Sequence, residues 1–266
     1  MVIHRLAICA IAKNEHFGLQ EWVAYHRLVG VEHFYIYDND SQIPVRETLA
    51  QEIAAGYVSC MELPGLSQQM PAYNDCLARN GADNVWIAFI DCDEFMVPKK
   101  TDSVVDVLGD YENYASLQVN WVLFGSDGHI KHPEGLVVES YTKSTPYHYK
   151  ENLHTKAIIQ PSKVQRAGSN PHYFVPKPGF YNVGENFEEV PNAWSKRHSV
   201  EKIQLNHYSI KSLDDFKAKM SKGRADAAHL PTASMDNFHM TDKWCTEKDT
   251  SIRRFVQPLR QSLRIV

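Results

Sequence analysis

The sequence predicts an α/β protein with a mixed, mostly parallel central sheet. Over the first 100 residues, short apolar runs alternate with helical patterns in the order that is typical of βαβ units. Polar residues follow each apolar run, and ligands of open α/β sheets bind beyond the carboxyl ends of the strands. The run 86–90 leads directly into the carboxylates Asp91, Asp93 and Glu94. We therefore expect one sheet whose functional site lies at its carboxyl edge.

Apolar periodicity defines the elements of the first half. Strands are expected over residues 6–12, 31–37, 57–63 and 86–90, and helices over residues 21–28, 45–55 and 70–79. Neither GxGxxG nor GxxxxGK[ST] occurs in the chain. A bound nucleotide would therefore have to be held by strand-end side chains and a metal ion.

The second half is less regular. Strands are expected over residues 115–124, 152–160 and 202–205, and a helix over residues 214–222. Residues 161–191 are rich in proline and glycine and should form long loops, where substrate selection commonly resides. From Ile252 the tail is basic and amphipathic, and Pro258 should kink or split its helix. We divide the chain into a domain of residues 1–240 and a basic amphipathic extension of residues 241–266.

Composition excludes several classes of protein. The chain of 266 residues is 43% apolar, which is enough for a sizeable core, and its formal net charge of −4 gives no general attraction to nucleic acid. The five cysteines form no CxxC pair, which argues against a zinc ribbon or a disulfide framework and favours a reducing compartment. No signal peptide and no apolar run of membrane-spanning length is visible.

The Asp91–Asp93 spacing is the main chemical signal. If the strand continues, both side chains leave the same face, and their repulsion predicts a cation between them or a raised pKa on one. A divalent ion held by such carboxylates commonly completes its shell with substrate phosphates. Two alternatives remain, a solvated acidic turn and a phosphatase nucleophile. The phosphatase pattern usually has Thr or Val where Phe95 stands.

Several segments together resemble glycosyltransferase family 92, the former DUF23 group, and related family-2-like enzymes. The segments are CAIAKNE (9–15), EWVAYH (21–26), HFYIYDNDS (33–41), QMPAYNDC (69–76), DCDEF (91–95), Trp121 with FGS (124–126), and NHY (206–208). The resemblance covers most of residues 5–225. It implies a GT-A-like fold in one domain, a nucleotide-sugar donor such as a UDP-sugar, Mn²⁺ or Mg²⁺, and inversion at the transferred carbon.

The resemblance also suggests roles for individual residues. The expected metal ligands are Asp91, Asp93 and His207. The side chains expected to hold the donor are Ala12, Asn14, Glu15, Asp38, Asn39, Gln69, Tyr73, Asn74, Asp91, Cys92, Lys156, Lys211 and Arg224. Alternatives stay open: Asp38 could form an Asx turn that caps the next helix, Tyr73 could be core, and His207 could be core or surface. His154, Lys219 and Lys222 are further candidates for the diphosphate.

An inverting transfer also needs a base for the acceptor hydroxyl. Asp127, on a glycine-flanked turn after a strand, is the first choice, with His129 as a nearby second. Glu188 and Glu189, close to Glu185, form another acidic group in the loop-rich region. A structural role in the turn is the alternative for Asp127.

The sequence thus predicts metal-dependent, inverting transfer of a hexose, with galactose as a guess, to a glycan or lipid-linked glycan acceptor. The alternatives are a non-catalytic glycan- or nucleotide-binding protein on the same fold and a metal-dependent phosphatase. Because the chain starts almost at its first strand, we expect a soluble, cytoplasmic, bacterial or viral enzyme. The tail could contact the inner face of a membrane, or it could pack its apolar stripe onto the domain.

Overall fold

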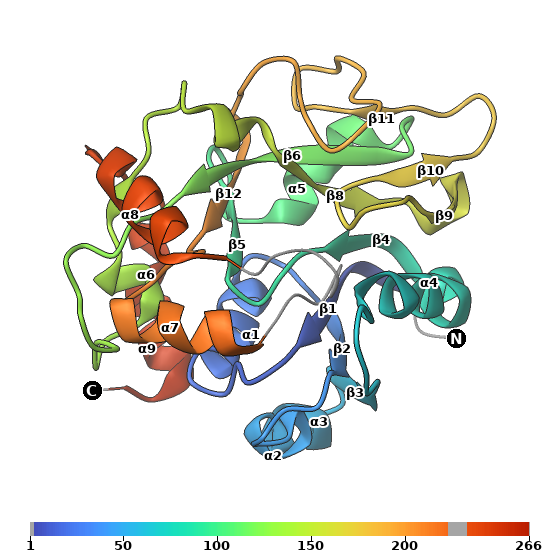
Figure 1. The fold of residues 1–266 in the computed structure, drawn as a ribbon. Coiled ribbons are helices and arrows are strands. Elements are labelled where there is room, and N and C mark those ends of the chain that lie inside the picture. The colour runs from blue at the N-terminus through green and yellow to red at the C-terminus, as the bar shows by residue number, and fades with distance from the viewer. Residues whose placement is uncertain (1–2, 223–232, 266) are drawn as a thin grey trace.

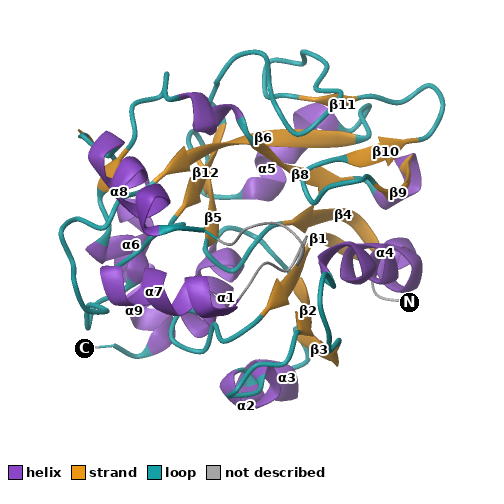
Figure 2. Cartoon of the chain, in the orientation of Figure 1, coloured by secondary structure: helices purple, strands orange, loops and turns teal. Residues whose placement is uncertain are grey.

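The computed structural model describes residues 3–222 and 233–265, which form a central sheet with helices on both faces (Figures 1 and 2). Within these residues, the main sheet has nine strands. They are β1 (His4–Ala12), β2 (His33–Asp38), β3 (Val58–Glu62), β4 (Asn84–Phe89), β5 (Glu94–Pro98), β6 (Ser116–Leu123), β8 (Thr155–Ile159), β11 (Asn182–Val183) and β12 (Ile203–His207).

The strand order is β3-β2-β1-β4-β8-β6-β12-β5, with β11 beside β6. Strands β1, β2, β3 and β4 pair in parallel, as do β6 and β12, whereas β8 and β5 run antiparallel to their neighbours. This confirms the expected mixed, mostly parallel sheet. Because β8 is reversed, its first residues, and not its last, lie at the carboxyl edge of β4 and β6.

The helices are α1 (Leu19–Leu28), α2 (Val45–Thr48), α3 (Ala50–Ala54), α4 (Gln69–Asn80), α5 (Val104–Leu108), α6 (Val137–Ser140), α7 (Leu213–Lys222), α8 (Met235–Trp244) and α9 (Val256–Leu263). None in the described part of the chain is both long and apolar enough to cross a bilayer. Two small ladders complete the fold, one of β9 (Val164–Ala167) with β10 (Phe174–Pro176) and one of β7 (Lys143–Ser144) with β13 (Glu247–Lys248).

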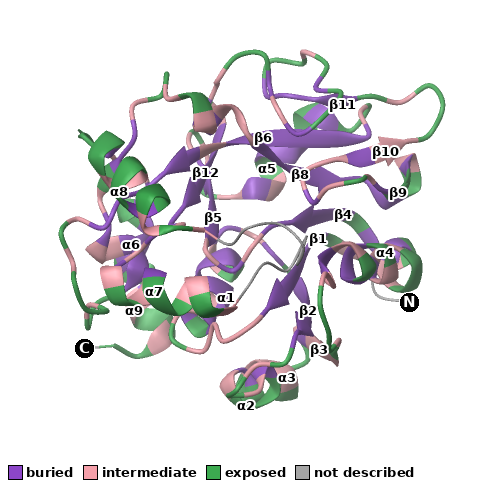
Figure 3. Cartoon of the chain, in the orientation of Figure 1, coloured by how far each residue is buried: buried purple, intermediate pink, exposed green. Residues whose placement is uncertain are grey.

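Strand β1 shows how the sheet separates two cores, because its successive side chains point to opposite faces. Leu6, Ile8 and Ala10 join the larger core, which also contains Trp22 of α1. Ala7, Cys9 and Ile11 join the smaller core with Tyr73 of α4. Figure 3 shows the sheet buried between the layers, while α2, α3 and α8 carry much of the exposed surface.

Several elements differ from the sequence prediction. The helix expected over residues 45–55 is divided into α2 and α3 at Leu49, whose φ of −112° is not helical. The loops expected over residues 161–191 contain the β9–β10 hairpin and β11. Strand β5 was not predicted, because the carboxylates before it indicated a loop, and helices α5, α6 and α8 were not predicted either.

The C-terminal tail packs onto the domain. A 3₁₀ turn (Ser251–Phe255) leads into α9, and Ile252, Phe255, Val256 and Leu259 are buried in the larger core. Pro258 lies in the first turn of α9, where its missing N–H removes no intrahelical hydrogen bond. The helical segment of the tail is divided just before Val256, where the 3₁₀ turn ends and α9 begins. The apolar stripe therefore packs against the domain. Of the residues expected to contact a membrane, the arginines are exposed, such as Arg253 and Arg264.

Candidate active site

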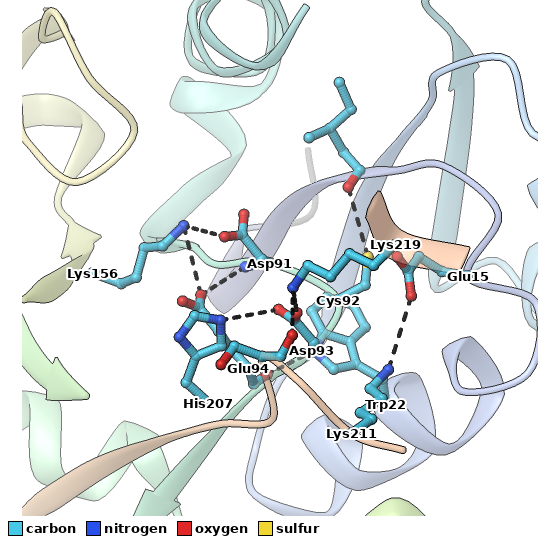
Figure 4. A network of polar contacts seen from close by, with 12 residues as sticks. Glu15, Trp22, Asp91, Cys92, Asp93, Glu94, Lys156, His207, Lys211 and Lys219 are labelled. Atoms are coloured by element: carbon cyan, nitrogen blue, oxygen red, sulfur yellow. Dashed lines mark hydrogen bonds and ion pairs between the residues drawn. The ribbon is translucent and has the colours of Figure 1, made fainter. Parts of the chain in front are cut away.

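The site lies in the tight turn between β4 and β5. The turn closes with a hydrogen bond from the Glu94 amide to the Asp91 carbonyl (3.0 Å). Strand geometry ends before Asp91, so the expectation that the Asp91 and Asp93 side chains share one strand face is wrong. Figure 4 shows the two carboxylates meeting different cations.

Asp91 is held by Lys156 of β8. The Lys156 Nζ lies 2.7 Å from Asp91 Oδ2 and 3.6 Å from Glu94 Oε2 (Figure 4). Glu94 Oε2 also accepts a hydrogen bond from the Asp91 amide (2.8 Å). Burial raises the pKa of Glu94 well above its ordinary value, and the two neighbouring carboxylates raise the pKa of Lys156 although burial opposes that charge. The raised pKa in this turn lies on Glu94 and comes first from burial, and sequence reasoning did not single out this residue.

Asp93 faces a second cation and a histidine. The Lys219 Nζ of α7 lies 2.7 Å from Asp93 Oδ2, and His207 Nε2 at the end of β12 lies 3.6 Å from Asp93 Oδ1. Burial works to raise the pKa of Asp93, but Lys219, His207 and Lys211 outweigh it and hold the pKa well below its usual range. Burial lowers the pKa of His207 to about 4, so the imidazole is neutral at pH 7.

The donor set of Asp93 and His207 fits part of a metal shell. A carboxylate oxygen and a neutral imidazole nitrogen are both ligands for Mn²⁺-type ions, and a separation of 3.6 Å allows one ion to touch both at about 2.1 Å from each. In the described residues, however, no three His, Cys, Asp or Glu side chains come close enough to hold an ion alone. Asp91, the third expected ligand, is turned toward Lys156. Any ion here would depend on oxygen atoms from the substrate.

More positive charge lies at the carboxyl end of β1. Glu15 pairs with Lys222 of α7 at 2.7 Å and with Lys211 at 4.0 Å. Lys211 adopts a left-handed backbone, with φ of 49°. The structure thus brings Glu15 and Lys211, both expected near the donor, to one rim. Arg224, expected at this rim as well, lies outside the described residues.

The residues after β2 organise loops. Asp38 accepts hydrogen bonds from the amides of Ser41 (3.0 Å) and Val45 (2.9 Å), which forms the Asx turn and helix cap given as the alternative. Asn39 donates to the carbonyls of Leu63 and Gly65, both at 2.8 Å. Both side chains hold the carboxyl edge of β2 in a fixed shape.

Asn14 ties the end of β1 to the loop after β2. Its amide donates to Ser41 Oγ (3.0 Å), and its Oδ1 accepts from the Gln42 amide (2.7 Å). The Ala12 carbonyl accepts from the Asn39 amide (2.8 Å). The strand ends at the floor of the site are therefore joined by backbone and amide hydrogen bonds.

Helix α4 contributes one side chain to the site. Gln69 donates to Asp91 Oδ1 (2.8 Å) and to the Tyr73 hydroxyl (3.0 Å). Tyr73 is fully buried against Phe89, the core role given as its alternative. Asn74 points away and accepts from the Ala167 amide (3.1 Å).

Cys92 is buried in the turn between the two aspartates. Its Sγ contacts the Ile11 carbonyl (3.7 Å), and burial raises the pKa of its thiol well above the usual range. The structure thus places Cys92 beneath the carboxylates, as packing.

The residues expected as the catalytic base lie in different places. Asp127 follows β6 at the same sheet edge as His207, but its carboxylate accepts bonds from the Thr142 amide (3.1 Å), the Thr142 hydroxyl (2.9 Å) and the Lys143 amide (2.9 Å). His129 contacts the Ser140 carbonyl (3.2 Å).

Glu188 and Glu189 follow β11, which pairs with Ser116 and Leu117 at the start of β6. Since β6 runs about 23 Å to its end beside His207 at 3.3 Å per residue, the structure does not bring these two carboxylates to the site.

Strand-end carboxylates, a facing histidine and a rim of lysines thus lie together at the carboxyl edge of a mostly parallel sheet, the edge at which α/β proteins bind their ligands. The family of the protein follows from its sequence: the model of glycosyltransferase family 92 matches residues 4–245, and the chain belongs to that family.

Relatives carry the same family name. A family 92 protein of Oryza sativa subsp. japonica is 26% identical over 96% of this chain and 44% of its own length, and one of Ricinus communis is 27% identical over 98% and 49%. The chain thus spans less than half the length of these curated relatives.

Solved structures show more distant similarity. Residues 1–349 of S. aureus TarS in complex with UDP-GlcNAc align with 73% of this chain and 62% of that chain, at 10% identity and a TM-score of 0.40. A glucosyl-3-phosphoglycerate synthase from Mycobacterium tuberculosis aligns with 44% of each chain, at 17% identity and a TM-score of 0.29. Neither score is high enough to bear on the chemistry of this chain.

Proposed function

We propose that the protein is a metal-dependent, inverting hexosyltransferase of the GT-A type that uses a UDP-sugar and a glycan or lipid-linked glycan acceptor. The observation that carries the proposal is the pair of Asp93 and His207, which face each other at the sheet edge beside Lys219. Asp93 and His207 would hold Mn²⁺ or Mg²⁺, which when bound stabilises the departing diphosphate as a Lewis acid.

The lysines support a diphosphate at this place. Lys219 and Lys211 bring ammonium groups to the rim, where phosphate oxygens could replace carboxylates as their partners. Lys156 holds Asp91 in place and is 1% exposed, so it acts through Asp91 and not on the donor directly.

Asp127 remains the proposed base, since it lies at the correct edge of the sheet. Its three hydrogen bonds hold the carboxylate in one orientation, and as the base it would accept a proton from an acceptor hydroxyl. All five cysteines are free in the structure, which supports a reducing, cytoplasmic location.

The test is release of UDP from a panel of UDP-sugars, with Mn²⁺ or with EDTA. Asp93→Asn should lower turnover about 100-fold or more, because the metal ion that stabilises the departing diphosphate would lose a charged ligand. Asp214→Asn, on the exposed face of α7, is the matched control and should leave turnover unchanged. Full activity of Asp93→Asn at saturating Mn²⁺ would contradict the metal role.

The same assay separates the alternatives. A non-catalytic binding protein would bind UDP, as seen by thermal shift, without releasing it from any donor. A phosphatase would release inorganic phosphate. With an acceptor present, Asp127→Asn should lower transfer while UDP affinity stays at the wild-type value; an effect of Glu188→Gln in its place would exclude Asp127.

A further inference from the structure

A group of aromatic rings borders the site on the side of His207. Trp121 lies 4.4 Å from His207, 4.8 Å from His154 and 5.3 Å from His172, measured between ring centroids. His154 in turn lies 3.6 Å from Trp194. Trp121, His154, His172 and Trp194 are each partly exposed, so the rings form a wall and not a closed core.

The wall is assembled from four separate parts of the chain. Trp121 comes from β6, and its amide donates to the His154 carbonyl (3.0 Å) just before β8. His172 comes from the loop between β9 and β10, and its Nδ1 contacts the Thr155 carbonyl (2.8 Å). The 192–195 segment pairs with residues 153–155, which places Trp194 over His154.

The wall and the adjacent His207 contain polar atoms that lack a partner. Within the described residues, Trp121 Nε1, His154 Nδ1 and His207 Nδ1 are buried and make no hydrogen bond. A buried unsatisfied donor or acceptor costs about 1–3 kcal/mol, so proteins rarely keep three such atoms together without a function. An indole N–H can only donate, and a neutral imidazole nitrogen can either donate or accept.

The wall is next to the charges of the turn. His154 lies just before β8 and precedes Lys156 by two residues. Burial and the charge of Lys156 hold the pKa of His154 at about 4. The charges of Lys156 and Asp91 also act on the pKa of His172. Both imidazoles are thus neutral at pH 7. This corrects the expectation that His154 supplies positive charge to the diphosphate.

We propose that Trp121, His154, His172 and Trp194 form a subsite that binds one pyranose ring beside His207. The inference deepens the proposed function, on which it rests. Sugar rings have an apolar face of C–H groups and an edge of hydroxyl groups. The partly exposed indole of Trp194 offers a flat apolar surface. A rotation of the rings on binding would bring the buried, unpaired nitrogens to the hydroxyls.

The bound ring could belong to the donor or to the acceptor, and the test separates the two. Saturation-transfer NMR with methyl β-galactopyranoside and methyl β-glucopyranoside is measured first on protein without nucleotide, for wild type, Trp194→Ala and Trp194→Phe. Calorimetry then gives the affinities of each variant for UDP and for the corresponding UDP-sugars. Trp244→Ala is the matched control, because Trp244 is an exposed indole that lies on α8.

We expect saturation transfer in wild type, its loss in Trp194→Ala, its retention in Trp194→Phe and no change in Trp244→Ala. If the ring belongs to the donor, Trp194→Ala also binds UDP-sugar about tenfold more weakly while UDP affinity is unchanged. If it belongs to the acceptor, both affinities stay at wild-type values and only the pyranoside signal is lost.

The proposal would be overturned if wild-type protein gave no saturation transfer to the pyranosides, or if Trp194→Ala gave the full wild-type signal. If wild-type protein bound no UDP but still showed saturation transfer that depends on Trp194, the proposed function would be overturned and the sugar subsite would be retained. If Trp194→Ala unfolds, His172→Ala removes another ring of the wall and must show the same loss of transfer.

Discussion

At the scale of single residues, the site is a set of opposed charges with built-in counterions. Three carboxylates lie within four positions, and the chain supplies Lys156 and Lys219 to them from opposite sides. Lys156 is almost fully buried, whereas Lys219 is 42% exposed. The buried cation thus has a structural role under Asp91, and the exposed one can change partners.

Lys156→Met should lower the free energy of unfolding by about 3 kcal/mol, because Asp91 and Glu94 would then lose the cation buried between them. Lys217→Met is the control: its pair with Asp214 is exposed on both sides and should contribute less than about 1 kcal/mol. Urea unfolding at pH 7 measures both changes. Equal midpoints for Lys156→Met and wild type would show that the buried pair contributes nothing.

Residue types at the site were largely predictable, but their partners were not. Asp93 and His207 follow strand ends and were expected together, and the structure brings them within 3.6 Å. Lys156 was expected to bind the diphosphate, yet it is sealed beneath Asp91, because the reversed direction of β8 could not be deduced from its sequence. Trp194 and His172 lie in irregular segments that give no periodic signal.

At the scale of elements, a carboxylate of α1 fixes the start of a distant helix. Glu21 accepts hydrogen bonds from the amides of Val137 (2.8 Å) and Val138 (3.1 Å), the first two residues of α6. These amides are among those that a helix cannot satisfy internally. Burial raises the pKa of Glu21 to about 7 in spite of these bonds.

The pKa of Glu21 predicts a pH dependence of stability. Its folded value of about 7 exceeds the ordinary 4.5, so its contribution is full below pH 4.5 and is lost as pH rises through 7. Between pH 5 and 8, wild type should therefore lose about 2–3 kcal/mol more than Glu21→Gln, which cannot titrate. Urea unfolding at both pH values gives the difference, and parallel losses in the two proteins would contradict the assignment.

Periodicity predicted most elements of the first half, and it failed where packing decides. Strand β5 is short, follows two acidic residues and begins with a third, so only its pairing with β12 makes it a strand. Leu49 interrupts an otherwise regular helical pattern, with a non-helical φ of −112° and a side chain buried in the larger core. Such elements depend on contacts with distant segments, which local sequence does not encode.

At the scale of the whole molecule, the C-terminal segment packs against the first helix of the domain. The apolar side chains of α9 enter the same core as Trp22 of α1, and Arg254 donates to the carbonyl of Pro98 (2.5 Å) at the end of β5. Arg260 pairs with Glu139 of α6 at 3.0 Å. The segment that sequence analysis separated as an extension therefore contributes to the core of the domain.

Truncation after Thr250 should prevent cooperative folding. It removes four buried apolar side chains, each contributing about 1.5–3 kcal/mol, and that sum is comparable with the total stability of a domain. Circular dichroism during urea unfolding is the measurement. Leu259→Ala should cost about 2–5 kcal/mol, and Ile265→Ala, exposed in the same tail, should cost little. A truncated chain with the wild-type midpoint would show that the tail is dispensable.

The strand order has a consequence for biosynthesis. Strands β3, β2, β1 and β4 are neighbours in the sheet and all come from residues 4–89, so this half can form while the rest is still being translated. Strand β12 lies between β5 and β6 but is made long after both. Until residue 207 leaves the ribosome, Asp93 has no histidine to face, and two strand edges stay open to wrong partners. The pair of Asp93 and His207 is therefore completed late in synthesis, after most of the sheet has formed.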